Sequence, residues 1–261
     1  MITGIGSVPF TRIYDAIAYS LRHTYPYLPE RVPSPELLRS TNTMLKEGID
    51  GIINAPGTLG CIGPFKKSVS GLYETVKIQC PGPATTAQIL MGRHKEENYT
   101  LDNAFDDAFT VADCHLSVIL DGLGVQEAIV FLDEPSLSTA GFDYVSLWSL
   151  LFEHLRKKFP QVAITAGVHA CCAPDWNVLA RSPLEIVSYD TSKWDITKDP
   201  EYKKSRNGKR IAWGIQKPED IRDYQPGDLI TPPCGLGLKT AKEAYDTLEM
   251  LQTAEKCFSK L

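Results

Sequence analysis

Two short stretches of the sequence carry residues that can hold a metal ion. Residues 168–174 read Val-His-Ala-Cys-Cys-Ala-Pro, and residues 231–237 read Thr-Pro-Pro-Cys-Gly-Leu-Gly. His169 and Cys171 end a small β-branched run and are two residues apart, so on a strand they point the same way. An imidazole and a thiolate side by side form half of a tetrahedral zinc site, and Cys234 is the best candidate for a further ligand.

The chemistry of such a site follows from its ligand set. Two cysteines and one histidine leave a fourth position open, which is typical of catalytic zinc. Zinc deprotonates a coordinated thiol, whose ordinary pKa is about 8.5, and so makes the sulfur a nucleophile at neutral pH. The alternative for His169 and Cys171 alone is a pair packed in the core. Cys172 points to the opposite face from Cys171, which favours packing for Cys172.

Composition indicates an ordinary globular protein. The 261 residues are 43% hydrophobic and 23% charged, and the net charge of −5 argues against a nucleic-acid-binding protein. No apolar run is long enough for a membrane span, and the start lacks the features of a signal peptide. Seven cysteines in such a chain favour reduced thiols. We therefore expect a cytoplasmic protein with no membrane partner, in which Cys61, Cys80, Cys114 and Cys257 are small buried side chains.

Apolar runs alternate with amphipathic stretches along the chain. Strands are expected at residues 2–8, 25–29, 76–80, 128–132, 161–167, 184–190, 210–216 and 228–230. Helices are expected at residues 15–23, 34–48, 85–91, 101–123, 142–159 and 240–258. Residues 57–71 are expected to form a Gly-rich loop, and the Lys-rich residues 194–210, with Lys203 and Arg206, a solvated excursion.

Continuously apolar strands that alternate with helices are typical of a parallel sheet. Eight strand–helix units in a chain of this length predict an α/β protein, a (β/α)8 TIM barrel in a single domain over residues 1–261. Residues 51–54 are an alternative to residues 25–29 as the second strand. A doubly wound sheet is the rival fold, but the first strand is not followed by its glycine fingerprint.

Active sites of such barrels lie where the strands end. The expected strand ends carry Ser7, Gln79, Asp133, Glu134, His169, Cys171, Asp190, Gln216 and Cys234. Polar and metal-binding side chains therefore occur where the apolar strands end, which is where the active site of such a barrel lies. The alternative for Asp133 and Glu134 is to cap the following helix, and Asp190 could equally cap a helix with Thr191 and Ser192.

Five motifs in order resemble the C-terminal barrel of cobalamin-independent methionine synthase, within the uroporphyrinogen-decarboxylase-like superfamily. They are Gly-Ser-Val-Pro at residues 6–9, Asp-Glu-Pro-Ser-Leu at 133–137, His-Ala-Cys at 169–171, Tyr-Asp-Thr-Ser at 189–192 and Cys-Gly-Leu-Gly-Leu-Lys-Thr at 234–240. The resemblance implies a zinc ion held by His169, Cys171 and Cys234, with Asp190 in the position of a glutamate ligand.

The same resemblance implies a substrate site. Ser7 and Asp133 would hold the amino-acid portion of a homocysteine-like thiol, with Glu134 as a further substrate-binding residue, and Asp133 and Asp190 would be catalytic. An ammonium group suits Asp133, and a carboxylate suits Ser7. The implied activity is a zinc-dependent transfer of a methyl group to a small thiol, with homocysteine favoured.

The sequence departs from this family in ways that bear on the methyl donor. Asp190 is one methylene shorter than glutamate, and residues 213–216 carry no histidine to act as the family's acid. The synthase's N-terminal domain has no counterpart here, so we expect a methylated corrinoid protein as donor and partner rather than a folate. Two alternatives stay open: a uroporphyrinogen-decarboxylase-like enzyme, and a non-catalytic barrel that partners a corrinoid protein.

Overall fold

The computed structural model describes residues 1–31, 56–93, 98–135, 137, 144–171, 175–206 and 208–258. Its strands are β1 (Ser7–Val8), β2 (Glu30–Arg31), β3 (Thr75–Pro81), β4 (Glu127–Asp133), β5 (Ala163–Ala170), β6 (Ile186–Asp190), β7 (Arg210–Gly214) and β8 (Leu229–Thr231). Its helices are α1 (Ile13–Ser20), α4 (Pro56–Val69), α5 (Pro83–Arg93), α6 (Leu101–Leu120), α7 (Tyr144–Lys158), α8 (Trp176–Arg181), α9 (Tyr202–Ser205) and α10 (Ala241–Phe258). Short 3-10 turns lie at η2 (Ile196–Lys198) and η3 (Pro218–Asp220).

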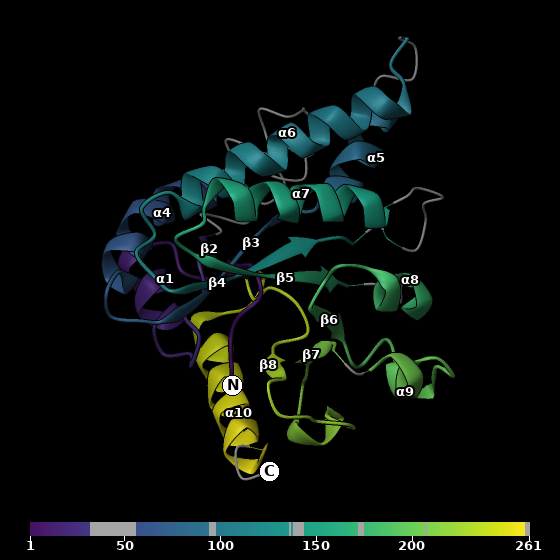
Figure 1. Ribbon diagram of the computed structural model, residues 1–261. Coiled ribbons are helices and arrows are strands. Elements are labelled where there is room, and N and C mark those ends of the chain that lie inside the picture. Colours follow the sequence, from purple (N-terminus) through teal and green to yellow (C-terminus); the bar gives the residue numbers. More distant parts are fainter. Residues whose placement is uncertain are drawn as a thin grey trace.

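Strands β3 to β8 form one parallel sheet in the order of the sequence, and α5, α6 and α7 cover one side of it (Figure 1). Strands β1 and β2 form a separate parallel pair. Isolated bridges join Ile2 to Ile230 next to β8, and Tyr27 to Lys77 in β3. The N-terminal segments therefore lie between the two edges of the six-stranded sheet.

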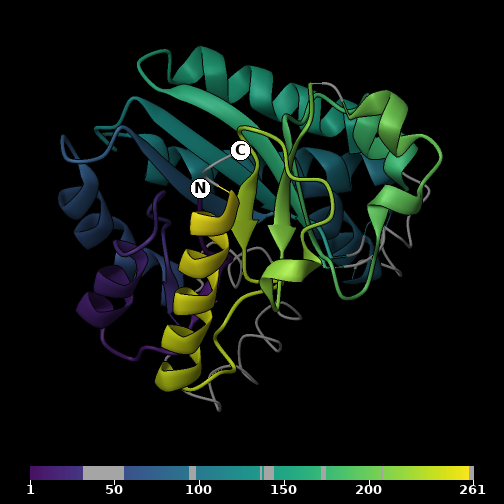
Figure 2. The same ribbon diagram turned by 90° about the horizontal axis from the view of Figure 1, so that it is seen from below.

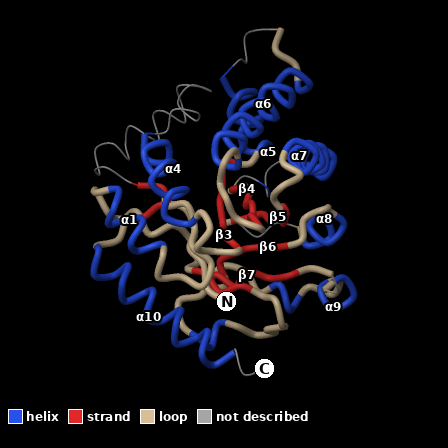
Figure 3. Tube along the Cα trace, turned by 60° about the vertical axis from the view of Figure 1, so that its left-hand side comes forward, coloured by secondary structure: helices blue, strands red, loops and turns tan. Residues whose placement is uncertain are grey.

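The sheet is curled, which is evident from side chains of distant strands that meet on its inner face. Ile129 and Phe131 of β4 pack in one cluster with residues of β6, β7 and β8, namely Ile186, Ala212 and Leu229. The alternate residues of β4 pack outward in the main core with the helices. Figure 3 shows the helices outside the strands, and Figure 2 shows α10 beside β8.

The predicted α/β architecture with a parallel sheet is confirmed, and six of the eight predicted strands form that sheet. The closed eight-stranded barrel is only partly reproduced: the described residues form a curled parallel half-barrel of six strands. The strand predicted at residues 25–29 was wrong in position, since β2 is Glu30–Arg31 and Tyr27 forms a bridge alone. The helix predicted at residues 34–48, the alternative strand at 51–54 and the packing of Cys172 lie outside the described residues.

The loop predicted at residues 57–71 is instead helix α4. Its glycines and Pro64 are poor helix formers, but Cys61, Phe65 and Val69 recur at helical spacing and are fully buried. Packing of that apolar face overrides the low propensity of the segment. Among the cysteines predicted to be buried, Cys61 and Cys80 are buried, whereas Cys114 and Cys257 are exposed.

The predicted solvated excursion contains a buried ion pair. Arg206 is 4% exposed, and its Nη2 donates to both carboxylate oxygens of Asp228, at 2.7 and 2.6 Å. Asp228 also accepts hydrogen bonds from the backbone N–H of Ile211 and from the indole of Trp213. The pair therefore ties the segment before β7 to the start of β8, and the prediction of a solvated Arg206 was wrong.

A buried histidine on α6 should make stability depend on pH. Burial lowers the pKa of His115 to about 4, and its side chain is 7% exposed. The unfolded chain binds this proton near pH 6.5 and the folded chain does not, so stability falls as the pH is lowered from 6.5 to 4, by up to about 3 kcal/mol. A His115→Leu variant should lose less stability than the wild type over this range in urea unfolding. Parallel pH curves for the two proteins would contradict the assignment.

In the part of the chain that the structure describes, we find no helix with both the length and the apolar character needed to span a bilayer.

Candidate metal centre

Strand register places the candidate residues next to one another at the carboxyl ends of the strands. Asp133 of β4 is opposite His169 of β5, and His169 is opposite Ser188 of β6. Residues two apart share a face, so Phe131 in the inner cluster places Asp133 on the same inner face. His169 is likewise inward, because its neighbours Val168 and Ala170 pack in the outer core.

His169, Cys171 and Cys234 meet at this end of the sheet. The Nε2 atom of His169 lies 3.0 Å from the sulfur of Cys171, and the sulfurs of Cys171 and Cys234 are 3.6 Å apart. All three ligand atoms lie within 4.8 Å of one another. Tetrahedral zinc with bonds of 2.0–2.3 Å needs ligand atoms about 3.5 Å apart, so the donor set fits this metal in both chemistry and spacing.

The electrostatics of the cluster favour one thiolate. Hydrogen bonds from Cys171 and from His169 lower the pKa of Cys234 to about 4. The same contact with Cys234 raises the pKa of Cys171, and burial lowers the pKa of His169. A neutral imidazole and an ionised sulfur are the forms that bind a metal cation.

A hydrogen bond orients His169 toward the cluster. Its Nδ1 lies 3.0 Å from the hydroxyl of Ser188, which is fully buried on the neighbouring strand. Because Nδ1 is engaged, Nε2 is the nitrogen that faces Cys171. Such outer partners fix the ring orientation of metal-binding histidines.

The loop that carries Cys234 is held against Ser7. The backbone N–H groups of Leu236 and Gly237 donate to the carbonyl and hydroxyl oxygens of Ser7, at 2.7 and 3.2 Å. A Cβ at Gly235 would lie 2.6 Å from the hydroxyl oxygen and 3.0 Å from the backbone nitrogen of Ser7, so a larger residue there would displace Ser7. Ser7 therefore positions the Cys234 loop, and its hydroxyl hydrogen is still able to bind an anionic group.

Asp190, the predicted fourth ligand, is not brought into the cluster. Its Oδ1 accepts hydrogen bonds from the backbone N–H and the hydroxyl of Ser192, at 2.9 and 2.6 Å. Its other oxygen lies 3.5 Å from Nζ of Lys193. These local contacts turn the short carboxylate toward its own loop, where it caps a turn rather than the predicted helix.

Glu134 is buried away from the cluster and caps helix α5. Its carboxylate accepts hydrogen bonds from the backbone N–H groups of Ala84 and Thr85, and from the indole of Trp148, at 2.7–3.0 Å. A side chain at Gly82 would lie 2.0 Å from the Glu134 carboxyl carbon, so the α5 turn approaches closely. These contacts assign Glu134 a structural role and give no support to a role in substrate binding.

Asp133 lies in a polar group that the sequence only partly indicated. Gln79 donates to Asp133 Oδ2 at 2.8 Å and to Glu30 Oε1 at 3.3 Å, and Lys77 donates to Gln79 Oε1. Within the described residues, Asp133 Oδ1 is buried and has no partner. Glu30 and Lys77 were missed: a strand extended to Arg31 would have put Glu30 at its end, and alternation along β3 puts Lys77 on the inner face with Gln79.

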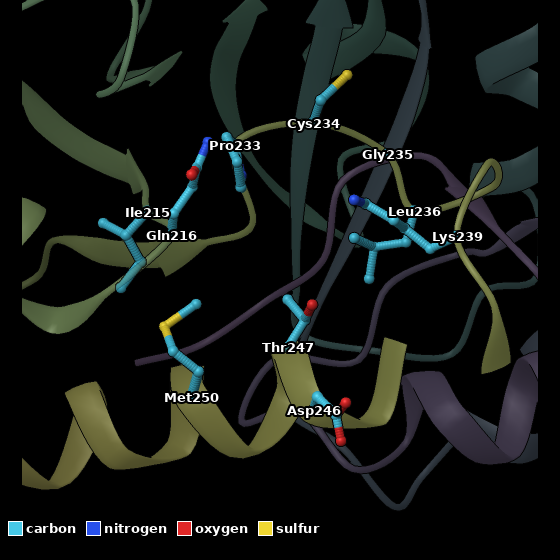
Figure 4. A pocket seen from close by; sticks show the side chains of 10 residues that line it. All are labelled: Ile215, Gln216, Pro233, Cys234, Gly235, Leu236, Lys239, Asp246, Thr247 and Met250. Atoms are coloured by element: carbon cyan, nitrogen blue, oxygen red, sulfur yellow. The ribbon is translucent and has the colours of Figure 1, made fainter. Parts of the chain in front are cut away.

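A cavity of about 430 Å³ lies behind the Cys234 loop. Its walls include Gln216 after β7, Leu236 in the loop, and Thr247 and Met250 on α10 (Figure 4). Cys234 itself lines the cavity, and Figure 4 shows its sulfur directed away from α10.

Comparisons with known proteins bear on the fold. No family model matches the sequence, and no curated protein matches it. Among solved structures, the fold is similar to that of a methyltransferase from Methanosarcina mazei, with a TM-score of 0.51 and 16% sequence identity. The similarity covers 78% of this chain and 64% of that one, so the chain spans less than two thirds of the methyltransferase's length. The chain therefore shares an α/β fold with a methyltransferase, and this likeness does not single out the methionine synthase barrel.

Proposed function

We propose that this protein is a zinc-dependent methyltransferase that acts on a small thiol, with homocysteine as the favoured acceptor. The observation that carries the proposal is the convergence of His169, Cys171 and Cys234 at the carboxyl end of the sheet. Asp133 lies at the same end, and its Oδ1 has no partner among the described residues. The fold that the chain shares with a methyltransferase agrees with this reaction class. We also propose a cytoplasmic location, because free thiols at the site are supported by a reducing compartment.

The metal, Asp133 and Ser7 have separate roles in the proposed reaction. Bound zinc would supply the Lewis acidity that keeps the acceptor thiol ionised at neutral pH. Asp133 would bind the acceptor's ammonium group, and the hydroxyl of Ser7 would donate to its carboxylate. Both lie on the same side of the sheet as the metal ligands, so they hold the acceptor sulfur at a fixed distance from the cluster. Fixed geometry of this kind accounts for a large part of the barrier lowering in bimolecular reactions.

The proposed donor is a methylated corrinoid protein. The new sulfur–carbon bond forms as the carbon–cobalt bond breaks, and cobalt keeps the bonding electron pair. This leaving group needs no proton, whereas the amine nitrogen of a methylfolate does. His169 is the last histidine in the sequence, so the chain beyond β5 has no imidazole to supply that proton.

The test uses protein loaded with cobalt(II) in place of zinc. Homocysteine should change the sulfur-to-cobalt absorption band, and homoserine, with oxygen in place of sulfur, should leave it unchanged. With zinc-loaded protein and methylcobalamin as a model donor, homocysteine should yield methionine. A cobalt spectrum that does not respond to millimolar homocysteine would refute the proposed acceptor, and would favour a barrel without this activity.

A further inference from the structure

We infer that Gln79 is a positioning residue that holds Glu30 and Asp133 as a matched pair for the acceptor's ammonium group, and so sets the preference for aminated thiols. The inference rests on the proposed function, since it concerns the acceptor. Gln79 would act through the two carboxylates that it binds and would not touch the acceptor itself.

The amide of Gln79 uses all its hydrogen-bonding capacity. Its oxygen accepts from the backbone N–H of Gly6 at 2.9 Å and from Lys77, while its nitrogen donates to Glu30 and Asp133. The orientation of the amide is unambiguous, because an N–H group and an ammonium can only donate. The Gln79 side chain is 2% exposed, so water does not compete for these bonds.

This amide brings two carboxylates from different elements to one place. Glu30 begins β2 and Asp133 ends β4, and both accept from the same nitrogen. Like charges this close repel unless donors lie between them. Gln79 occupies one oxygen of each carboxylate, and Asp133 Oδ1 is left buried without a partner in the described structure. An ammonium group, with three donors, is a chemical group that can donate to that oxygen.

The surrounding charges point to a cation as well. Burial raises the pKa of both Glu30 and Asp133, and the negative charge of Glu30 raises the pKa of Asp133 further. Glu134 acts on Asp133 in the same direction. Lys77 opposes this for both carboxylates, but it is a single cation, fixed over the ring of Phe131 at 4.8 Å. One further positive charge would balance the second carboxylate.

The experiment compares two acceptors in one protein. Calorimetry on zinc-loaded protein would measure binding of homocysteine and of 4-mercaptobutyrate, which is homocysteine without its amine. The wild type should prefer homocysteine by about 10- to 100-fold, the range expected for buried hydrogen bonds to a charged group. In Gln79→Met the preference should fall about 10-fold, through weaker homocysteine binding alone, because the released carboxylates no longer converge.

Control variants separate this role from a structural one. A general loss of fold or metal would weaken both thiols equally, so the ratio isolates the positioning effect. Gln79→Asn keeps the amide but is too short to reach both carboxylates, and should lower the ratio with less disturbance of the core. Gln126→Met, at an exposed position before β4, should leave the ratio unchanged.

Two outcomes would overturn the inference. A wild-type protein that binds neither thiol would refute the proposed function and this inference together. A wild-type protein that prefers homocysteine, with Gln79→Met and Gln79→Asn keeping that preference, would refute the role of Gln79 and leave the proposed function intact.

Discussion

Replacing Cys234 with serine should strip zinc from the protein, and replacing Cys171 should do the same. The two sulfurs are 3.6 Å apart and come from different parts of the chain, 63 residues apart. Neither cysteine alone forms a site, so each variant leaves at most two of the three clustered ligands. Loss of an outer hydrogen-bond partner weakens metal binding by about 10- to 100-fold, and loss of a direct ligand should exceed this range.

Elemental analysis after metal-replete expression would measure the effect. We expect about one zinc per chain in the wild type and a small fraction of that in each variant. Cys114→Ser is the matched control, because Cys114 is exposed on α6 and should not affect zinc content. If Cys171→Ser and Cys234→Ser both kept the zinc content of the wild type, the metal would have to bind at another place in the protein. If the wild type contained no zinc, the prediction of a zinc site would be wrong, and the thiol pair at the end of the sheet would need another explanation.

Replacing Asp228 with asparagine should destabilise the protein by about 3–5 kcal/mol, the effect of breaking a buried ion pair from one side. The side chains of Arg206 and Asp228 are 4% and 1% exposed. The neutral amide would leave the guanidinium without a counter-charge. Its NH2 group would also face N–H donors of Arg206, Ile211 or Trp213, each of which now binds a carboxylate oxygen.

Urea unfolding followed by circular dichroism would measure this loss. Asp246→Asn is the control, since Asp246 pairs with Lys242 on the surface of α10 and both side chains are more than half exposed. An exposed pair of this kind contributes less than about 1 kcal/mol. Similar small effects for the two variants would show that Arg206 finds other partners when Asp228 is neutral.

The sequence by itself predicted the parallel α/β fold and the clustering of His169, Cys171 and Cys234. Periodicity carries this information, because alternation on a strand places His169 and Cys171 on one face wherever the strand lies. Parallel strands bring their carboxyl ends to one edge, so a cysteine after the last strand meets them there. The prediction of one domain over residues 1–261, and those of a corrinoid partner and a cytoplasmic location, stay predictions.

Only the tertiary structure decided which polar residues join that cluster. Asp190 has a strand-end position like that of His169, but local bonds with Ser192 and Lys193 turn it away. Glu134 caps a helix that begins 51 positions earlier in the chain, at Pro83. Register and the curl of the sheet determine these contacts, and neither is encoded in short-range periodicity.

The sequence alone also did not show which charged side chains would be buried. Arg206 lies in a Lys-rich, aperiodic stretch, and nothing local distinguishes it from its exposed neighbours. Its burial depends on Asp228, 22 residues later, and on how β7 and β8 align. Glu30 of β2, Gln79 of β3 and Asp133 of β4 likewise form one group because three strands meet at the inner face. A sequence shows which side chains share a face of one element, and folding decides which faces meet.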